Sequence, residues 1–184
     1  MFKFVRTAGL AAIAALSMTA ASNAAIVYAT GVTVNVVGTN AGDTGRADPL
    51  AALGAADGKF YSLGLGGAAT FTFLPAAYFK APLSVVEITF GNRAKHVERI
   101  NIFGMAGMTS TLLGSITNNK LTSSLMFSGV FQALKVVDAS DVKKARDGFD
   151  IDSISVAAVP LPAGGLLLLS ALGGIAALRR RKAV

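Results

Sequence analysis

Short stretches of β-branched and aromatic residues recur along the central part of the chain, separated by clusters of Gly, Asn and Asp. In one of them Phe71 and Phe73 alternate with Thr70 and Thr72. Alternation with a period of two places neighbouring side chains on opposite faces and predicts half-buried antiparallel strands. No stretch of this central part keeps a helical period over three turns. The predicted strands cover residues 26–37, 69–74, 83–90, 97–103, 111–116, 130–137 and 149–156.

About seven or eight such strands in one domain predict an all-β fold, a single antiparallel β-sandwich or jelly roll over residues 25–158. A short helical turn is expected near Asp48 to Leu53. A body of this length buries roughly two-thirds of its unfolded surface in one core. The phenylalanines between Phe60 and Phe149 are the predicted filling of that core.

Composition narrows the function classes further. Apolar residues make up 53% of the chain and charged residues 15%, a balance that excludes a charged disordered chain. The chain has no cysteine, which excludes disulfide scaffolds, thiolate zinc sites and cysteine nucleophiles. The net charge is +7, but six of the 17 basic residues lie at the two ends, and the others nearly balance the ten acidic ones. No nucleic-acid partner is therefore expected.

The first 24 residues have the pattern of a secretory signal peptide. Lys3 and Arg6 precede an apolar stretch over residues 8–21, and small residues then lead to a cleavage site between Ala24 and Ala25. The expected partners are the Sec translocon and signal peptidase. The alternative is an uncleaved membrane anchor, for which the apolar stretch is short.

The last residues of the chain predict a membrane anchor. Two prolines precede an uncharged stretch over residues 164–178, which as a helix spans about 22 Å. That is shorter than the roughly 30 Å hydrocarbon core, so we expect a short transmembrane helix assisted by its flanking residues. The basic cluster that follows should remain cytoplasmic, which leaves the body outside. This cluster consists of Arg179, Arg180, Arg181 and Lys182.

Together, these C-terminal elements resemble the sorting signal of the PEP-CTERM proteins, in the VPLPA variant. The resemblance covers residues 159–182 and rests on a motif, a short apolar helix and an Arg-rich end in that order. The recognition motif would be Val159, Pro160, Leu161, Pro162 and Ala163. The family implies cleavage by a VPLPA-type exosortase, with transient residence in the inner membrane and release to the cell surface or an exopolysaccharide matrix. The alternative is an unprocessed periplasmic protein anchored in the inner membrane.

The body more loosely resembles exported β-rich domains that this class often carries. The similar stretches are residues 52–58, 62–67 and 148–156. Domains of that kind look like jelly rolls or galactose-binding-type sandwiches. The resemblance carries over no catalytic residue.

Asp150 and Asp152 are the most conspicuous polar pair of the body. Two residues apart on a strand, their carboxylates leave on the same face, where they repel unless a cation lies between them. A structural calcium ion would suit such oxygen ligands, with Asp57 and Asp147 adding ligands from turns. The alternative is that these aspartates cap turns or pair with nearby basic residues. The basic residues considered for such pairs are Lys143, Lys144 and Arg146.

Nothing in the sequence predicts an enzyme. His96 is the only histidine and lies in a polar segment, where a solvated loop position is expected. No Gly-x-Ser-x-Gly motif is present, and nothing in the pattern places Glu87 and Glu98 in a cleft. We therefore expect a non-enzymatic exported surface or matrix protein. The alternative function is a carbohydrate- or calcium-binding, adhesin-like module that contacts exopolysaccharide.

Overall fold

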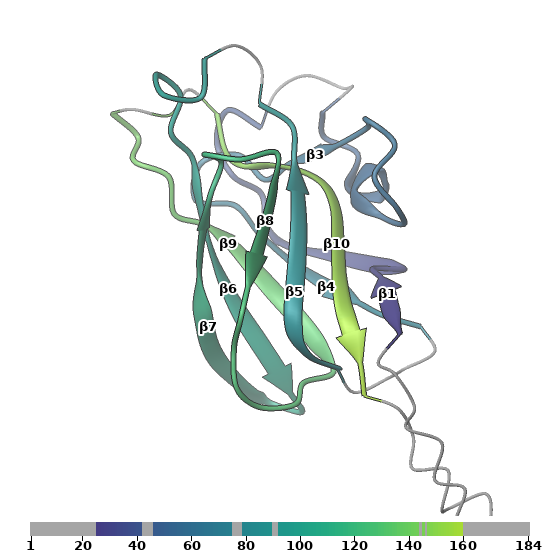
Figure 1. The fold of residues 1–184 in the computed structure, drawn as a ribbon. Helices are drawn as coiled ribbons and strands as arrows, with labels where there is room; N and C mark the ends of the chain where they lie inside the picture. Colours follow the sequence, from purple (N-terminus) through teal and green to yellow (C-terminus); the bar gives the residue numbers. More distant parts are fainter. Residues whose placement is uncertain are drawn as a thin grey trace, which may run out of the picture. The chain divides into compact units, whose positions relative to one another are not determined.

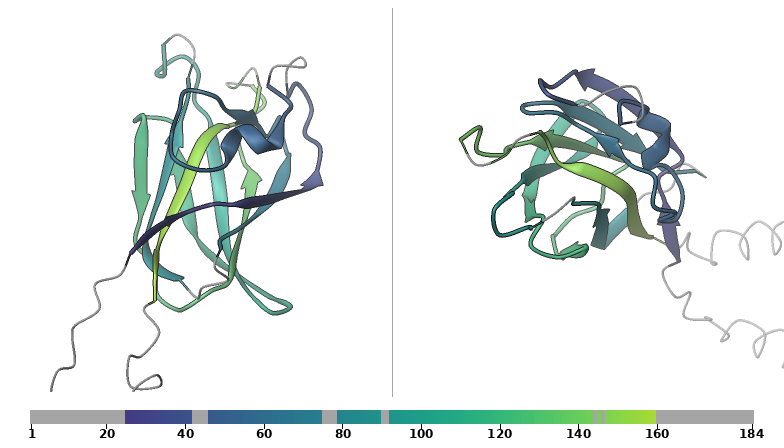
Figure 2. Two further views of the ribbon diagram at one scale, coloured as in Figure 1. Left: turned by 90° about the vertical axis from the view of Figure 1, so that its right-hand side faces the viewer. Right: turned by 90° about the horizontal axis from the view of Figure 1, so that it is seen from above.

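The computed structural model describes residues 25–41, 46–74, 79–89, 92–143, 145 and 147–159. They form two antiparallel β-sheets packed face to face, which confirms the predicted all-β sandwich (Figures 1 and 2). No helix in this described part is long and apolar enough to cross a membrane. The predicted signal peptide, the transmembrane helix over residues 164–178 and the sorting motif beyond Val159 lie outside the described residues.

The first sheet is built around the last strand of the body. Its strands are β1 (Ile26–Tyr28), β3 (Tyr61–Ser62), β5 (Phe79–Glu87), β8 (Thr122–Leu125) and β10 (Asp150–Ala158). They follow the order β1-β10-β5-β8, and β3 also pairs with β10. Strand β10 is buried along nearly its whole length because it has neighbours on both edges and the second sheet over its face.

The second sheet has the order β2-β4-β9-β6-β7. Its strands are β2 (Gly31–Val36), β4 (Ala68–Thr72), β6 (Arg99–Ala106), β7 (Thr109–Thr117) and β9 (Ala133–Asp138). The chain passes from the first sheet to the second between β1 and β2. There the N–H of Ala29 donates to Ile154 O in the first sheet, and the N–H of Thr30 donates to Thr72 O in the second.

The core lies between the sheets and is filled by branched and aromatic side chains. Leu83 and Val85 enter it from β5, and Ile100 and Ile102 from β6. Five phenylalanines of the described residues are buried, as the sequence predicted. They are Phe71, Phe73, Phe79, Phe131 and Phe149. Burial of each such side chain contributes about 1.5–3 kcal/mol to stability.

Every predicted strand range contains an observed strand. The predicted helical turn is the 3-10 helix η1 (Pro49–Ala52), and Asp48 caps it by accepting a hydrogen bond from the N–H of Leu50. Two strands were not predicted, β3 and β8, because they are short and carry Ser and Thr rather than an apolar run. In β5 the buried row is Leu83, Val85 and Glu87, so an acidic residue continues the inward face.

Strands of both sheets end or begin together at one end of the sandwich, which we call the loop end. There β5, β7 and β9 finish and β6 and β10 begin, as the register of Glu87 with Ile151 and of Arg99 with Thr117 requires. The loop end lies at the top of Figure 1. The body's first and last described residues meet at the opposite end, where the N–H of Ala158 donates to Ala25 O at 2.8 Å.

Candidate functional site

The inward-facing rows of several strands end in polar side chains at the loop end. In β5 the row ends in Glu87, after two apolar residues. Alternation along the strand carries each of these side chains inward behind its apolar neighbours. The equivalent residues are Glu98 before β6, Asn118 after β7 and Asp138 at the end of β9, and each is at most 5% exposed. A buried polar layer thus closes the core at this end.

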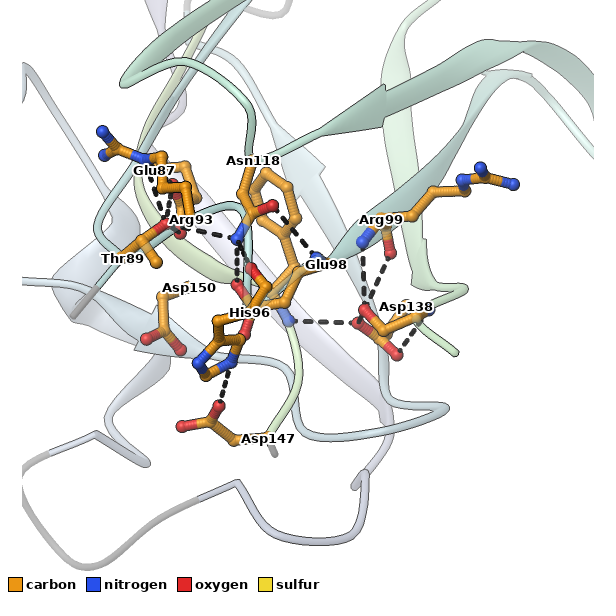
Figure 3. A network of polar contacts seen from close by, with 12 residues as sticks. Glu87, Thr89, Arg93, His96, Glu98, Arg99, Asn118, Asp138, Asp147 and Asp150 are labelled. Carbon is orange, nitrogen blue, oxygen red and sulfur yellow. Dashed lines mark hydrogen bonds and ion pairs between the residues drawn. The ribbon is translucent and has the colours of Figure 1, made fainter. Parts of the chain in front are cut away.

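Around this layer nine side chains form one cluster, which we call the loop-end network; Figure 3 labels its members other than Arg46. Long-range contacts assemble it, since Arg46 and Asp150 are 104 positions apart and yet 2.6 Å from each other. Its members are Arg46, Glu87, Thr89, Arg93, His96, Glu98, Asn118, Asp147 and Asp150.

Asn118 is the connector of the network. Its Oδ1 accepts a hydrogen bond from the N–H of Glu98 at 3.0 Å. Its Nδ2 donates to His96 O at 2.8 Å, to Glu98 Oε2 at 3.2 Å and to Thr89 Oγ1 at 3.3 Å. One amide therefore fixes the loop that carries His96 to the start of β6.

His96 lies between two carboxylates. Its Nε2 is 2.7 Å from Glu98 Oε1 and 2.8 Å from Asp147 Oδ1. Despite these short distances, Nε2 has no partner in hydrogen-bonding geometry, and neither has Asp147 Oδ1. The side chain of His96 is 17% exposed. The expectation of a solvated loop residue was therefore wrong.

Arg46 joins the two aspartates on the other side of the network. Its Nη2 is 2.6 Å from Asp147 Oδ2 and 2.6 Å from Asp150 Oδ2. The guanidinium also lies over the ring of Phe60, 5.4 Å from its centroid. Arg46 is thus a cationic partner that the sequence interpretation did not consider; of the basic residues that it did consider, Lys144 and Arg146 lie outside the described residues.

Glu87 contacts two residues that follow its own strand, β5, in the sequence. The hydroxyl of Thr89 lies 2.5 and 2.6 Å from the two carboxyl oxygens, and Arg93 Nε is 3.7 Å from Oε2. Arg93 Nε also donates to Thr89 Oγ1 at 3.2 Å. The terminal nitrogens of Arg93 point away from the network (Figure 3).

Burial dominates the electrostatics of these carboxyl groups. Loss of solvent, together with the nearby charges of Asp150 and Glu87, raises the pKa of Glu98 to about 10. Loss of solvent likewise raises the pKa of Glu87 to about 7, against the opposing effect of Thr89 and Arg93. The pKa of Asp150 rises to about 6 for the same reason, although Ser62 and Arg46 counteract the rise. The network therefore binds protons, or another cation, more readily than exposed carboxylates do.

Asp138 and Asp152 are buried anchors of the backbone. Asp138 accepts hydrogen bonds from the N–H groups of Gly66, Ser140 and Phe149 and from the hydroxyl of Ser140. Asp152 accepts hydrogen bonds from the backbone N–H groups of residues 57 and 58, at 3.1 and 3.2 Å. Both carboxylates hold loops against the sandwich by accepting hydrogen bonds from the backbone N–H groups of those loops.

The four aspartates considered for calcium fall into two pairs. Asp147 and Asp150 meet on Arg46, within the loop-end network. Asp57 meets Asp152 through its backbone N–H, whereas its own carboxylate accepts from the N–H of Lys59 and is half exposed. Asp57 therefore contributes no carboxylate to the cluster around Asp147.

A depression opens beside the network, with a volume of about 370 Å³. Arg93, Ala94 and Val97 line it from the loop before β6, and Thr117, Asn118 and Asn119 line it from the turn after β7. A second depression of about 450 Å³ lies on the other side of that turn and shares Thr117 and Asn119. Of the described lining residues, the only charged ones are Arg93 in the first and Lys120 in the second.

No protein-family model and no curated protein sequence matches the chain. The sandwich does match solved structures, among them several that are distant in sequence. One is a pectin-binding carbohydrate-binding module, with 15% identity, a TM-score of 0.51 and coverage of 74% of this chain and 96% of that one. Another is the family 32 carbohydrate-binding module of C. perfringens NanJ in complex with galactose, with 14% identity, a TM-score of 0.50 and coverage of 72% and 98%.

A third match is a truncated AlyQ with family 32 carbohydrate-binding and alginate lyase domains. It shares 15% identity with a TM-score of 0.52, and the match covers 74% of this chain. The chain spans only 35% of that structure's length. These likenesses concern architecture. The described body of the chain has the galactose-binding-like β-sandwich fold of the family 32 carbohydrate-binding modules.

Proposed function

We propose that this chain is a non-enzymatic, exported carbohydrate-binding module whose ligand occupies the depression beside the loop-end network. The observation that carries the proposal is the make-up of that depression, which combines apolar and hydrogen-bonding walls in a volume of about 370 Å³. A pyranose ring has the same dual character, with C–H groups on its faces and hydroxyls at its rim. Small-molecule sites commonly pair apolar walls with a few well-placed polar groups.

The described walls supply both kinds of contact. Ala94 and Val97 are exposed and give an apolar surface for a sugar face. Arg93 uses its Nε within the network and directs its terminal nitrogens outward. The hydrogen bonds of Asn118 hold the wall in place, so little ordering is needed when a ligand binds.

The charge of the walls favours an acidic sugar. Arg93 and Lys120 are cationic, and neither depression has an acidic side chain among its described lining residues. Guanidinium groups bind carboxylates through paired N–H donors. The proposed ligand class is therefore a uronate-containing polysaccharide, such as an acidic exopolysaccharide.

Delivery to that polysaccharide is the second part of the proposal. The signal-like first 24 residues and the VPLPA-type motif beginning at Val159 support export by the Sec route and processing by an exosortase. The body's two ends meet at the end opposite to the depressions. The chain therefore enters and leaves the body away from the proposed binding surface.

Calorimetric titration of the purified full-length protein tests the binding proposal. We expect saturable binding of oligogalacturonate or oligoalginate, weakened by salt because part of it is ionic. Arg93→Ala should weaken binding at least about tenfold, as expected for loss of a charge-assisted hydrogen bond. Lys59→Ala, which removes an exposed cation that lines neither depression, is the matched control. Equal affinity for both variants, or no saturable binding to the wild type, would contradict the proposal.

A further inference from the structure

Three donor atoms of the loop-end network converge within one small region. Nε2 of His96, a carboxylate oxygen of Glu98 and one of Asp147 all lie within 4.8 Å of one another. The imidazole nitrogen is 2.7 and 2.8 Å from the two oxygens, without the direction of a hydrogen bond to either. Ligand atoms around a tetrahedral zinc ion, with bonds of about 2.0–2.2 Å, lie about 3.3–3.6 Å apart, so these donors need to separate by less than about 1 Å to hold an ion between them.

The charges of the network call for an additional cation. Four buried or nearly buried carboxyl groups meet two guanidinium groups, those of Arg46 and Arg93. If all four carboxyl groups are ionised and His96 is neutral, the described side chains of the network leave two negative charges uncompensated in a site with little solvent. Such charges are costly unless protons or a metal ion neutralise them. A divalent ion supplies both missing charges at once.

Buried atoms without hydrogen bonds give a second indication. Nε2 of His96 and Oδ1 of Asp147 are both buried, and neither has a partner in hydrogen-bonding geometry. Buried polar atoms are normally hydrogen-bonded, so two such atoms within one group of converging donors point to a positively charged ligand between them.

We propose that His96, Glu98 and Asp147 bind a divalent transition metal ion of the Zn²⁺ type. An imidazole ligand favours zinc-like ions over calcium, which takes oxygen ligands. The hydrogen bond from Asn118 to Glu98 Oε2 orients the second carboxylate oxygen, as outer partners of metal ligands usually do. The ion would tie the loop before β6 to the segment before β10.

Zn²⁺ binding to the full-length protein, purified without a histidine tag and treated with chelator, tests the proposal. We expect one bound ion per chain, little competition from Ca²⁺, and a higher melting temperature with Zn²⁺ because only the folded site binds it. His96 is the chain's only histidine, so its imidazole NMR signals report the site directly. They should move when Zn²⁺ is added. No saturable Zn²⁺ binding, or binding with unmoved signals, would overturn the proposal.

Substitutions distinguish the loss of a metal ligand from a loss of folding. His96→Gln and Asp147→Asn should each weaken Zn²⁺ binding by more than the roughly 10–100-fold that the loss of an outer partner costs. Asp57→Asn removes an exposed carboxylate outside the site and should bind Zn²⁺ like the wild type. Lys120→Ala, which removes a cationic wall residue outside the loop-end network, should weaken sugar binding and keep Zn²⁺ binding, and this distinguishes the inference from the proposed function. Unchanged affinity in both His96→Gln and Asp147→Asn would refute the assignment, and if either variant fails to fold, the wild-type NMR titration decides.

Discussion

Individual acidic residues at the loop end sit in an environment that favours their neutral form. Glu87 and Glu98 are each 1% exposed, and Asp150 is 2% exposed. Asp138, by contrast, is surrounded by N–H and hydroxyl donors that suit a carboxylate. Similar burial therefore has different consequences, because the partner atoms decide whether the charged form is stabilised.

Glu87 should make the stability of the metal-free protein depend on pH. Its pKa is raised in the folded state from its ordinary value of 4.5 to about 7, so the folded protein keeps a proton that the unfolded chain releases. The free energy of unfolding should then fall as the pH rises from about 4.5 to 7. Urea unfolding in chelator-containing buffers across this range measures the effect.

Glu87→Gln is the matched variant for that prediction. The amide has nearly the same shape and cannot ionise, so the decline between pH 4.5 and 7 should become shallower. Asp57→Asn changes an exposed carboxylate and should leave the wild-type slope unchanged. An identical pH dependence in wild type and Glu87→Gln would show that Glu87 does not hold the proton.

Single residues of the site were only partly predictable from the sequence. The pair Asp150 and Asp152 stands out by its spacing, and the structure buries both. Their partners are distant in the chain, and nothing local indicates that Arg46 should meet Asp150. His96 looks exposed because its neighbours in the sequence are polar. The alternation of Glu98 with Ile100 and Ile102 was the available signal that it faces inward.

At the scale of elements, a close backbone contact fixes the segment that carries Asp147. A Cβ atom on Gly148 would lie 2.3 Å from the backbone carbonyl carbon and oxygen of Gly64. On the far side of Phe149, the N–H of Leu63 donates to the carbonyl of Phe149. The segment before β10 is thus pressed against the chain that follows β3, which holds Asp147 toward His96 and Arg46.

Gly148→Ala should therefore disturb the loop end. The added methyl group meets backbone rather than a flexible side chain, so we expect a loss of about 3 kcal/mol in unfolding free energy, at the upper end of overpacking effects. Gly54→Ala is a suitable comparison, because its Cβ would meet nothing within 4 Å and only its positive φ is unfavourable, at about 1–2 kcal/mol. Chemical denaturation of both variants measures the difference. A smaller loss for Gly148→Ala than for Gly54→Ala would contradict the packing argument.

The elements themselves follow well from the pattern of the sequence. Alternating Phe and Thr mark β4, and Phe71 is buried as expected. The face of β5 was ambiguous, because Val85 and Val86 point to opposite sides and both are apolar. Packing of Leu83 and Val85 into the core shared with the second sheet decides which face is buried. That information lies in contacts between strands and not within the strand.

At the scale of the whole molecule, the loop end, where we propose that ligand binds, lies opposite the end where the chain enters and leaves the described body. Strands β1 and β10 pair with Ile26 opposite Ala157, so the chain enters and leaves the body at one place. The loop end lies at the other end of the same strands. This arrangement suits a module that is tethered or processed on one side and meets its ligand on the other.

The proposed processing predicts a shortened product in the native host. Exosortase cleavage near residues 159–163 and removal of the signal peptide should leave a chain that begins at Ala25 and lacks residues 166–182. Intact-mass analysis of the protein isolated from the cell surface and from the medium measures both ends. A surface product that still carries residues 166–182 would remove the sorting proposal and leave an anchored protein.

The position of the ligand on the sandwich tests the account most directly. Backbone NMR spectra of the full-length protein, recorded while a uronate oligosaccharide is added, map the residues that respond. The account predicts that saturable shifts concentrate in residues 92–97 and 117–120, with Arg93 and Asn119 among the largest. Shifts gathered instead around β1 at the opposite end, or no shifts at high ligand concentration, would contradict it.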